Sequence, residues 1–597
     1  MNQFLSTLKT ISNKRFSFPL EGRFGLAFKA FSRRERNIFF ASAGIMAATT
    51  VILLLWVNQQ FIVQVPAYKG SLVEGVLNTP AHINPLLATD EIGYEADRDL
   101  TALIYSGLLR SDGKGGFIPD LAKSYDISPD GLTYTFILKH GLTWHDGKSL
   151  TASDVAFTIK TVQDTRTKSP KYSSWDGVQV EQIDDLTIRF TLGKPYTLFL
   201  ENATLGILPE HIWKTIDFNR FDSNKYNREP IGSGPYKFVS MQTVSKDGDD
   251  IPVSYTLSAF KNFALGEPYI QTIKTIFYRN EDELKKALES GSVDAINGVS
   301  SATAEELEKR GYRVEHTPLP RVLAVFFNQN QASIFADVSV RKALALVVDK
   351  NVIIDKVLGG YGVVLDSPIP PGALGYEPSL PEKSHDDRMT QARALLTKAG
   401  WKFDNVKNIW SKKTKTATLT LSFNLATSEA PELKAVADLL QSSWQELGVK
   451  VDVNLFSTGD LKETVIRPRK FDALFFGQVV GRDSDLYPFW HSSQRLDPGL
   501  NLASYTNPDV DKILSQAQTE QDLAKRAKDY QQANDEIVKD VPAIFLYAPQ
   551  FLYVVPEKLR GVVLESVSVP AERFLNVYQW FVNTDSVWKI FAPSSGT

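Results

Sequence analysis

The stretch Pro119–Gln163 decides the fold: PDLAKSYDISPDGLTYTFILKHGLTWHDGKSLTASDVAFTIKTVQ. Within it, Asp130-Gly131 is typical of a tight turn, because glycine accepts the positive φ that such turns need. Polar and apolar residues then alternate from Thr133 to Leu138. This two-residue period predicts a half-buried β-strand.

The same stretch also contains a helix start. Thr151 is followed three residues later by Asp154, a pattern like a capping box, in which short side-chain oxygens satisfy the first N–H groups of a helix. We therefore expect a helix over Ala152–Val162, directly after the predicted hairpins.

The order of residues in this stretch carries a resemblance. The pattern LA-x-SY-x-IS-x-DGLTYTF-x-LK-x-GLTWHDGK-x-LTASDV-x-FT resembles the hallmark of the family 5 extracellular solute-binding proteins. These are the oligopeptide-, dipeptide- and nickel-binding components of ABC importers. The segment Ile231–Phe238, IGSGPYKF, resembles the turn with which the chain of these proteins returns to the first large lobe. The resemblance implies a binding protein rather than an enzyme, with no catalytic residues and no cofactor.

Composition supports an ordinary globular protein of more than one lobe. A chain of 597 residues exceeds what one hydrophobic core usually supports. The formal net charge of −3 argues against a general nucleic-acid binder. Cysteine is absent, which excludes disulfides, a thiol nucleophile, thiolate metal sites and a lipid-modified amino-terminal cysteine.

The amino-terminal region predicts a membrane anchor. Ile38–Val57 is an uncharged run of twenty residues, about the length that crosses a bilayer core of ~30 Å as a helix. Eight basic and two acidic residues precede it, so the positive-inside rule places residues 1–36 in the cytoplasm and the bulk of the chain outside the cell membrane. A cleaved signal peptide is the alternative, but its apolar core is normally ~7–15 residues long. We read a single-pass signal anchor.

The resemblance implies an α/β, periplasmic-binding-protein-like fold. We expect two large lobes with mixed sheets around a hinge, a smaller side lobe, and one amino-terminal transmembrane helix before them. The expected divisions are a cytoplasmic segment 1–36, the anchor 37–57, a tether 58–69, lobe I at 70–104 and 227–318, the side lobe 105–226, lobe II 319–541, and a return to lobe I with a tail at 542–597.

Several helices are predicted from spacing and caps. Asp99–Arg110 places leucine and isoleucine at helical spacing. Ser428–Gly448 carries one apolar stripe and ends on a glycine suited to a helix terminus. Asn507-Pro508 is a typical helix start, and two successive helices should follow it up to about Lys539.

The candidate ligand-binding residues come in two sets. In peptide-binding members of the family, an aspartate shortly after the strand that matches Phe471–Val480 pairs with the ligand ammonium. Here Asp483 and Asp485 are the candidates, although the spacing differs from that pattern and Asp483 could instead cap the next helical turn. Tyr487 and Trp490 could form an aromatic wall, or pack in the core.

The second set lies where the family's chain meets the cleft between the lobes. Asn78, Thr79 and Pro80 occupy its first turn. Asn328 and Asn330 follow the strand that enters lobe II, and their amides could bind a ligand backbone.

Metal and hydrolytic chemistry have little support. The histidines at 82, 140, 145, 211, 316, 385 and 491 show no HxxH or HExxH spacing, so we expect no metal site, although a nickel chelate held by one histidine stays open. The sequence has no GxSxG elbow and no paired-carboxylate signature, so these patterns give no indication of a hydrolase.

The leading hypothesis is therefore a monomeric, membrane-anchored solute receptor with a short peptide as ligand and an ABC transporter permease as partner. It would act by closing its lobes over the ligand. The alternatives are a binding protein for an oligosaccharide or a metal chelate, and a ligand-sensing receptor.

Overall fold

The computed structural model describes residues 31–89, 93–113, 116–196, 198–246, 249–379, 384–415, 417–481 and 485–591. The chain divides into two compact units. Unit 1 consists of Met1–Ala67 and Thr584–Thr597, and unit 2 consists of Tyr68–Asn583. Asp483 lies outside the described residues.

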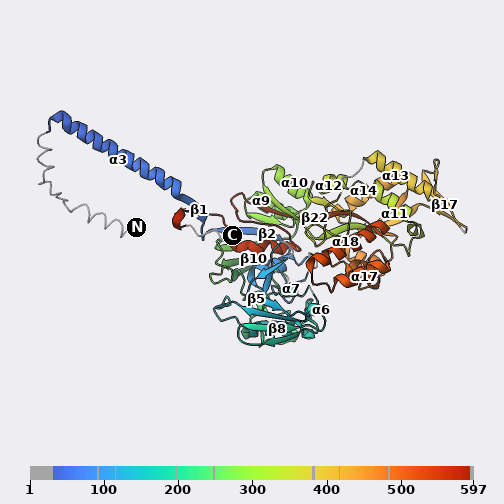
Figure 1. Cartoon of the computed structure of the whole chain (residues 1–597), viewed down its shortest axis with the longest axis horizontal. Coiled ribbons are helices and arrows are strands. Elements are labelled where there is room, and N and C mark those ends of the chain that lie inside the picture. The colour runs from blue at the N-terminus through green and yellow to red at the C-terminus, as the bar shows by residue number, and fades with distance from the viewer. Residues whose placement is uncertain are drawn as a thin grey trace. The chain divides into compact units, whose positions relative to one another are not determined.

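Unit 1 is built on the helix α3 (Arg33–Phe61), which contains the predicted apolar run (Figure 1). A capping box starts it: Ser32 Oγ accepts from Glu35 N, and the Glu35 carboxylate accepts from Ser32 N at 2.7 Å. Among the described residues, α3 is the one helix long and apolar enough to cross a membrane. After α3, the strand β1 (Ile62–Pro66) pairs antiparallel with β23 (Thr584–Trp588).

Unit 2 is organised around one mixed sheet, twelve-stranded over the described residues (Figure 1). Its strands run in the order β20-β19-β21-β14-β22-β12-β2-β11-β10-β9, while β13 and β15 pair only with β22. The bounds are β2 (Ser71–Leu77), β9 (Tyr236–Lys246), β10 (Asp249–Ala259), β11 (Thr272–Tyr278), β12 (Ala295–Asn297), β13 (Arg313–Pro318), β14 (Arg321–Phe327), β15 (Gly362–Val364), β19 (Ser422–Ser428), β20 (Lys450–Phe456), β21 (Ala473–Val479) and β22 (Ala543–Val555).

The strand β22 joins the two large lobes. Its first part lies opposite β14, with Phe326 facing Ala543. Its second part lies opposite β13, with Arg313 facing Val555. The chain therefore passes between lobe I (β2 and β9–β13) and lobe II (β14, β15 and β19–β21) along β22 and at the short link between β13 and β14.

Both faces of lobe II are packed. On β14, Leu323, Val325 and Phe327 enter one hydrophobic core, while Val322, Ala324 and Phe326 enter another. This alternation is the two-residue period of a strand. The helices that cover the lobes are α4 (Glu95–Ile104), α9 (Glu281–Glu289), α10 (Ser301–Lys309), α11 (Val338–Val347), α12 (Lys350–Val357), α13 (His385–Lys398), α14 (Pro431–Leu447), α15 (Thr458–Asp460), α16 (Tyr487–Trp490), α17 (Pro508–Ala517) and α18 (Leu523–Asp540).

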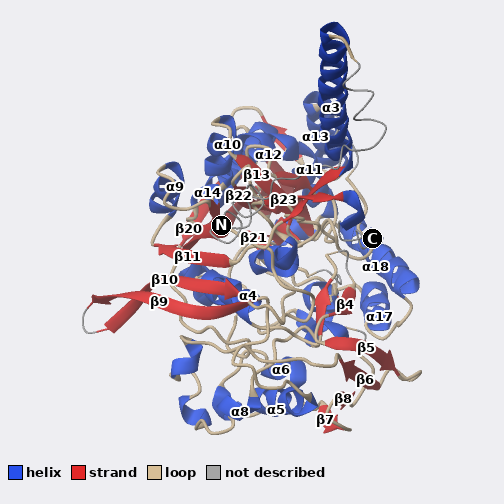
Figure 2. Ribbon diagram, turned by 90° about the vertical axis from the view of Figure 1, so that its left-hand side faces the viewer, coloured by secondary structure: helices blue, strands red, loops and turns tan. Residues whose placement is uncertain are grey.

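The side lobe is a four-stranded antiparallel sheet in the order β5-β6-β8-β7. Figure 2 shows α5, α6 and α8 gathered with these strands at one end of unit 2. Its elements are β5 (Ala122–Ile127), β6 (Thr133–Leu138), β7 (Gln179–Gln182), β8 (Thr187–Thr191), α5 (Ala152–Val162), α6 (Tyr172–Trp175), α7 (Phe199–Asn202) and α8 (Glu210–Trp213). Smaller sheets pair β3 (Leu109–Ser111) with β4 (Phe117–Pro119), and β16 (Lys402–Asp404), β17 (Ile409–Lys413) and β18 (Thr418–Thr420) in that order.

The predictions made from local patterns are confirmed both in the side lobe and in lobe II. The strand β6 and the helix α5 have the expected bounds, and Thr151 and Asp154 form the capping box. At the end of α14, Gly448 has φ 93°. At the start of α17, Asn507 Oδ1 accepts from the backbone N–H of Asp509.

The helix predicted over Asp99–Arg110 is wrong in its bounds. It begins earlier, at Glu95, and ends at Ile104, after which Tyr105 is extended. The cause is tertiary: a Cβ on Gly107 would lie 2.5 Å from the carbonyl oxygen of Thr204. The chain here is pressed against the side-lobe backbone and continues as the strand β3.

Two motifs that are far apart in the sequence meet at His145. Its Nε2 donates to Gly234 O at 3.0 Å, and its Nδ1 accepts from Gly232 N at 3.2 Å. Loss of hydration lowers the pKa of His145 to about 4, so the ring is neutral. A Cβ on Gly232 would lie 2.0 Å from Ile104 O, which explains the glycine. The hydrogen bonds of His145 therefore connect the stretch Pro119–Gln163, which we call the hallmark stretch, to the turn at Ile231–Phe238.

A buried ion cluster fixes the carboxyl-terminal return of unit 2. Arg573, on the 3₁₀ segment η7 (Pro570–Gln579), is fully buried. Its five N–H groups bind Glu74 at 3.1 and 2.7 Å, Asp99 at 2.8 and 2.6 Å, and Pro570 O at 2.9 Å. Glu74 also accepts from Asn297 Nδ2 at 3.0 Å. We call these residues the Arg573 cluster.

Electrostatics within the Arg573 cluster follow from burial. Burial by itself would lower the pKa of Arg573, but attraction to Asp99 and Glu74 outweighs it and raises that pKa. Burial also raises the pKa of Glu74, against the opposing effect of Arg573. The cluster joins β2, α4 and η7, so it locks these three elements together.

Candidate functional site

A cavity of about 1000 Å³ lies within unit 2. Segments far apart in the sequence line it: residues between 98 and 104 and between 568 and 578 from lobe I and its return, residues between 105 and 125 and between 198 and 206 from the range expected for the side lobe, and 372–376 with 523 and 526 from lobe II. Small-molecule sites usually enclose roughly 300–1,000 Å³. The cavity is therefore at the large end of that range and is built jointly by the three lobes.

The helix α4 and the segment η7 form one wall. Arg98, Thr101 and Ala102 of α4 line the cavity, and so do Phe574 and Tyr578 of η7. Asp99 of α4 and Arg573 of η7 belong to the Arg573 cluster. The cluster therefore holds the two elements that carry this wall.

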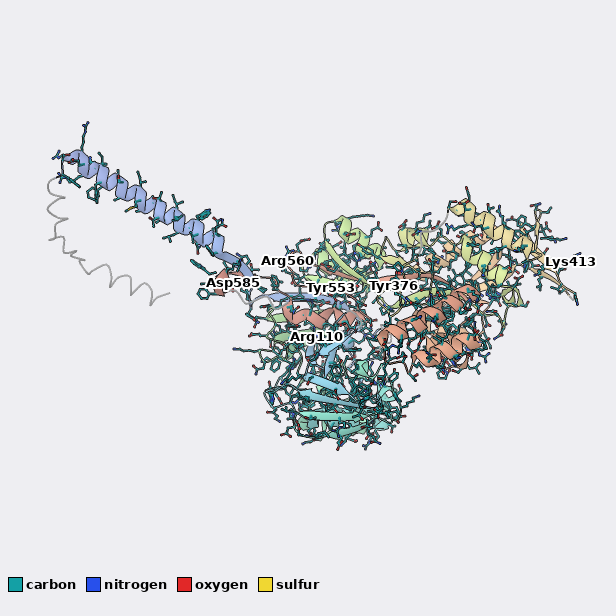
Figure 3. All side chains as sticks on the ribbon, viewed as in Figure 1. Arg110, Tyr376, Lys413, Tyr553, Arg560 and Asp585 are labelled. Atoms are coloured by element: carbon teal, nitrogen blue, oxygen red, sulfur yellow. The ribbon has the colours of Figure 1, made fainter. Side chains whose placement is uncertain are left out.

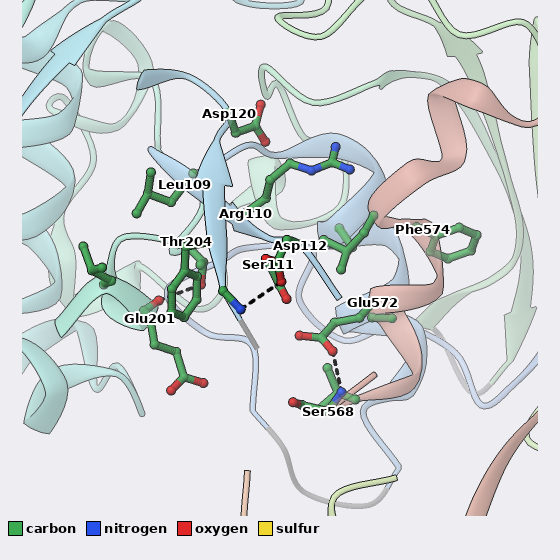
Figure 4. A pocket seen from close by; sticks show the side chains of 18 of the residues that line it. Leu109, Arg110, Ser111, Asp112, Asp120, Glu201, Thr204, Ser568, Glu572 and Phe574 are labelled. Carbon is green, nitrogen blue, oxygen red and sulfur yellow. Dashed lines mark hydrogen bonds between the residues drawn. The ribbon is translucent and has the colours of Figure 1, made fainter. Parts of the chain in front are cut away.

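Arg110 and Asp120 are two of the charged residues that line the cavity (Figure 4). The guanidinium of Arg110 stands 5.3 Å from the centre of the Tyr578 ring. Asp120 is 6% exposed, and burial raises its pKa to about 6, while attraction to Arg110 and Lys139 and a hydrogen bond from Ser106 act in the opposite direction. Asp120 Oδ1 and Arg110 Nε have no hydrogen-bond partner within the described residues.

Two more polar atoms of the lining have no hydrogen-bond partner within the described residues. Among the described residues, Thr101 Oγ1 and Tyr105 OH are buried without a partner. Burial raises the pKa of Tyr105. Leaving a buried donor or acceptor unpaired costs ~1–3 kcal/mol, so these groups favour a polar guest or ordered water in the cavity. We call Arg110, Asp120, Tyr105 and Thr101 the unpaired wall.

The remaining lining combines aromatic rings with charges that are already engaged. Glu572 accepts from Ser568 N at 2.5 Å, and Asp112 accepts from Gly116 N at 2.8 Å (Figure 4). Rings of the lining are contributed by Phe117, Tyr125, Phe263, Tyr376, Phe574 and Tyr578. Tyr376 comes from lobe II and Arg110 from the region next to lobe I (Figure 3).

The lobes touch beside the cavity at glycines. A Cβ on Gly372 of lobe II would lie 2.8 Å from Ser566 Oγ, on the return segment. A Cβ on Gly131 of the side lobe would lie 2.3 Å from Gln521 Nε2. Both glycines have positive φ, at 80° and 69°. These close approaches bring the lobes together around the cavity.

The first predicted turn lies next to α4 but outside the cavity lining. Asn78 has φ 62° and its N–H donates to Tyr278 O at 2.9 Å. Asn78 and Thr79 are exposed and Pro80 is buried. The following backbone is held by Asp97, which accepts from Ala81 N at 3.1 Å. Ligand contact by Asn78, Thr79 and Pro80 stays a prediction.

Asn328 and Asn330 have different environments. Asn328 is buried, its Nδ2 donates to Arg469 O at 2.9 Å, and its Oδ1 accepts from Asn330 N at 3.2 Å. Its side chain thus organises the turn after β14. Asn330 is exposed. Neither lines the cavity, and their ligand contacts stay predictions.

Asp485 lies at the start of the helix α16, one residue before its N-cap residue Leu486. Its Oδ1 accepts from Tyr487 N at 3.0 Å and its Oδ2 accepts from Gln518 Nε2 at 3.2 Å. Burial raises the pKa of Asp485, while these hydrogen bonds and Arg526, which lines the cavity, oppose the rise. Both Asp485 oxygens are thus engaged within the protein, and ligand contact by Asp485 stays a prediction.

The two predicted aromatic residues pack within lobe II. Tyr487 stacks on His491 with ring centres 4.1 Å apart. Trp490 is buried among Phe326, Tyr505 and Phe545. Their side chains are accounted for by these contacts, and a ligand-binding role for either stays a prediction.

The sequence reasoning did not single out the residues that line the cavity. Asp120 lies in the stretch Pro119–Gln163, directly before the buried residues Leu121 and Ala122. This acidic residue at the start of a buried segment was an available signal. Residues 568–578 gave no comparable signal, because their place in the cavity depends on the distant contacts of Arg573.

Metal ligation finds no support in the described parts of the chain. No group of three or more histidine, aspartate or glutamate side chains is placed to hold an ion among those residues. The charged lining is suited to hydrogen bonding with a polar solute, and the rings are suited to contact with its apolar parts.

The chain is similar to known binding proteins. The model of bacterial extracellular solute-binding proteins, family 5 Middle, matches residues 116–497. The oligopeptide-binding protein AppA of Bacillus subtilis (strain 168) is 29% identical over 525 residues, covering 87% of this chain and 92% of its own. These matches confirm the resemblance that the hallmark stretch carries.

Solved structures agree with the fold. The structure of AppA from Bacillus subtilis in complex with a nonapeptide gives a TM-score of 0.64 at 28% identity, over 87% of this chain and 100% of that one. NikZ from Campylobacter jejuni in complex with Ni(L-His) gives 0.66 at 27% identity, over 87% and 100%. The expected periplasmic-binding-protein-like fold is thereby confirmed.

Proposed function

This chain belongs to family 5 of the bacterial extracellular solute-binding proteins, and we propose that it is a membrane-anchored receptor that captures short peptides and delivers them to an ABC transporter permease. The observation that carries the proposal is the cavity, whose lining combines aromatic rings with the unpaired wall. A peptide offers both apolar side chains and a backbone rich in donors and acceptors, so it matches both parts of this lining.

The size of the cavity supports a ligand larger than a single amino acid. Its volume of about 1000 Å³ is at the upper end for small-molecule sites. The related AppA was solved with a nonapeptide. A nickel chelate of the kind in the NikZ complex is less well supported, because the described lining residues include no histidine.

Capture would proceed by closure of the two large lobes. The chain crosses between them at β22 and at the link between β13 and β14, and such narrow crossings act as hinges. Opening would separate the contacts at Gly372 and Gly131. Small-angle scattering of the purified chain should show a smaller radius of gyration with peptide than without it, and an unchanged radius would contradict closure.

Anchoring by α3 would keep the receptor beside its permease. The helix has the length and apolarity for one crossing, and the basic residues before it favour a cytoplasmic amino terminus. Membership of the family supports delivery to a permease, a step that needs no covalent chemistry.

The ligand class can be tested by native mass spectrometry of the full chain, purified in mild detergent without denaturation. We expect additional masses that match short peptides and that disappear after unfolding and refolding. Sugars, metal chelates or no bound mass, even after incubation with a tryptic peptide mixture, would contradict the peptide assignment.

The predicted ammonium clamp can be tested separately. If Asp483 pairs with the ligand amino terminus, Asp483→Asn should weaken binding of free-amine peptides at least tenfold and leave their amino-acetylated forms within about twofold, since the charge pair is worth more than ~1.4 kcal/mol. Asp485→Asn is the matched control, because the Asp485 carboxylate is already engaged by Tyr487 N and Gln518 Nε2. Equal losses for both peptide forms would remove the clamp.

A further inference from the structure

The described carboxyl-terminal residues pair with the strand that leaves the apolar helix. In unit 1, β1 starts at Ile62, directly after the last residue of α3, and Ile62 lies opposite Trp588 of β23. At the other end of the ribbon, Pro66 lies opposite Thr584, next to Asp585 (Figure 3). The chain therefore runs from residue 584 to residue 588 toward the end of α3.

The register fixes the level of Trp588 relative to the apolar run. The uncharged run ends at Val57, five residues before Ile62, which is ~7.5 Å along a helix axis. The headgroup layer adds roughly 5–7 Å to each side of the hydrocarbon core. If α3 crosses a bilayer upright, Trp588 lies at the outer limit of the headgroups.

Two of the three described residues that follow Trp588 are apolar and exposed. The turn η8 (Lys589–Phe591) carries Ile590 and Phe591, each with 75% of its surface exposed, and Trp588 is 45% exposed. Phe61, at the end of α3, is 50% exposed. Aromatic side chains with a nearby lysine are typical of the membrane–water interface.

We propose that residues 588–591 insert into the outer headgroup layer of the same bilayer that α3 spans, as a second attachment of the receptor to lipid. The proposal rests on the anchoring by α3 proposed above. Lipid is favoured over a protein partner because the β1–β23 register makes this apolar turn continuous with the outer end of α3.

A second attachment has a mechanical consequence. Unit 2 begins at Tyr68 and ends at Asn583, and both ends continue into the β1–β23 ribbon. The cavity-bearing unit would therefore be held through two chain segments rather than one flexible tether. Loss of the lipid contact would free one of them.

The absence of cysteine permits a direct test with single labels. Full-length Phe591→Cys, Thr584→Cys and Leu54→Cys variants are each labelled with an environment-sensitive dye and reconstituted in phosphatidylethanolamine–phosphatidylglycerol vesicles that contain shallow spin-label quenchers. Thr584 is the matched control, because it is exposed on the same ribbon but four residues, ~13 Å, farther from α3 than Trp588. Leu54 reports insertion of the helix itself.

We expect the dye at residue 591 to shift to the blue and to be quenched at least twofold more than the dye at residue 584. Quenching at residue 54 with equal, water-like signals at 591 and 584 would overturn the second attachment and leave the anchor intact. Lack of quenching at residue 54 would overturn the anchor as well. Protection of residue 591 only when a permease is co-reconstituted would overturn the assignment to lipid.

A second variant excludes an effect of the label. In the Trp588→Ser, Ile590→Ser, Phe591→Ser background, a dye at Lys589→Cys should lose the shallow quenching that it shows in the otherwise unchanged chain. Retained quenching would overturn the role of these apolar side chains.

Discussion

The Arg573 cluster and the unpaired wall each contain an arginine and a carboxylate in the same unit, and they differ in how completely their polar atoms are paired. Arg573 uses all five N–H groups, on Glu74, Asp99 and Pro570. Around Arg110 and Asp120, four polar groups have an atom without a partner among the described residues. The polar N–H groups of Arg573 are therefore satisfied within the protein, whereas the unpaired wall has polar atoms that a bound ligand or water could pair with.

The two sets are nevertheless connected. Asp99 and Arg573 hold α4 and η7, and these elements carry Thr101, Phe574 and Tyr578 into the cavity lining. A fully paired ion cluster thus holds the two elements that carry polar atoms without a partner into the cavity lining. This arrangement agrees with the general observation that functional sites carry locally costly groups which the surrounding structure holds in place.

The largest expected effect comes from breaking the Arg573 cluster. Arg573→Met keeps much of the volume but leaves Glu74 and Asp99 buried and without their cation. Removing one partner of a buried ion pair costs about 3–5 kcal/mol, so the free energy of unfolding in urea should fall by that amount. Arg560→Met is the control, because Arg560 is exposed and should change the free energy by less than about 0.5 kcal/mol. If both substitutions lowered the free energy of unfolding equally, the special role of the paired, buried Arg573 would be contradicted.

The next largest effect is a gain in the free energy of unfolding, expected for a substitution of Asp120. Burial raises the pKa of Asp120 from 3.8 to about 6, so the folded chain binds this proton more tightly than the unfolded chain. The charged carboxylate therefore destabilises the fold above pH 6, and this penalty disappears as the pH falls toward 3.8. Asp120→Asn should raise the unfolding free energy at pH 8 by up to about 3 kcal/mol.

The pH dependence distinguishes this explanation from a general packing effect. Urea unfolding of the ligand-free chain should show a smaller gain for Asp120→Asn at pH 5 than at pH 8. Peptide affinity should fall in the same variant, because a ligand donor loses its charged acceptor. A gain that is equal at both pH values, or a loss of stability, would show that Asp120 is not a strained carboxylate.

The smallest effect concerns a neutral group of the unpaired wall. Tyr105→Phe removes a buried hydroxyl that has no partner among the described residues, so the ligand-free chain should become more stable by up to about 1 kcal/mol. The measurement is the same urea titration, with Tyr134→Phe as control, since Tyr134 OH donates to Tyr196 O at 3.2 Å and its removal should destabilise. A loss for Tyr105→Phe would mean that its hydroxyl is satisfied in solution.

Local patterns in the sequence predicted local structure accurately. The alternation at Thr133–Leu138, the cap at Thr151 and the glycine at residue 448 each depend on neighbours within a few residues. The helix at residues 95–104 was misplaced, because its end depends on the contact between Gly107 and Thr204. Spacing alone cannot report such a contact.

The cavity shows the same limit more strongly. Candidate residues after β21 came from the family pattern, and the Asp485 carboxylate accepts from Tyr487 N and Gln518 Nε2. The cavity lining instead combines α4, the segment around Arg110 and Asp120, and η7. Arg573 and Glu74 are 499 positions apart, so no window of sequence contains both.

The sequence by itself determined the apolar helix and the strands and caps of the stretch Pro119–Gln163, because periodicity and capping act between near neighbours. The class of protein came from the resemblance that this stretch carries. Only the tertiary structure decided which charges are paired, which polar atoms face a cavity, and that β23 returns to the end of α3. These properties depend on burial and hydrogen bonding between segments hundreds of residues apart, and such contacts form only when the whole chain has folded.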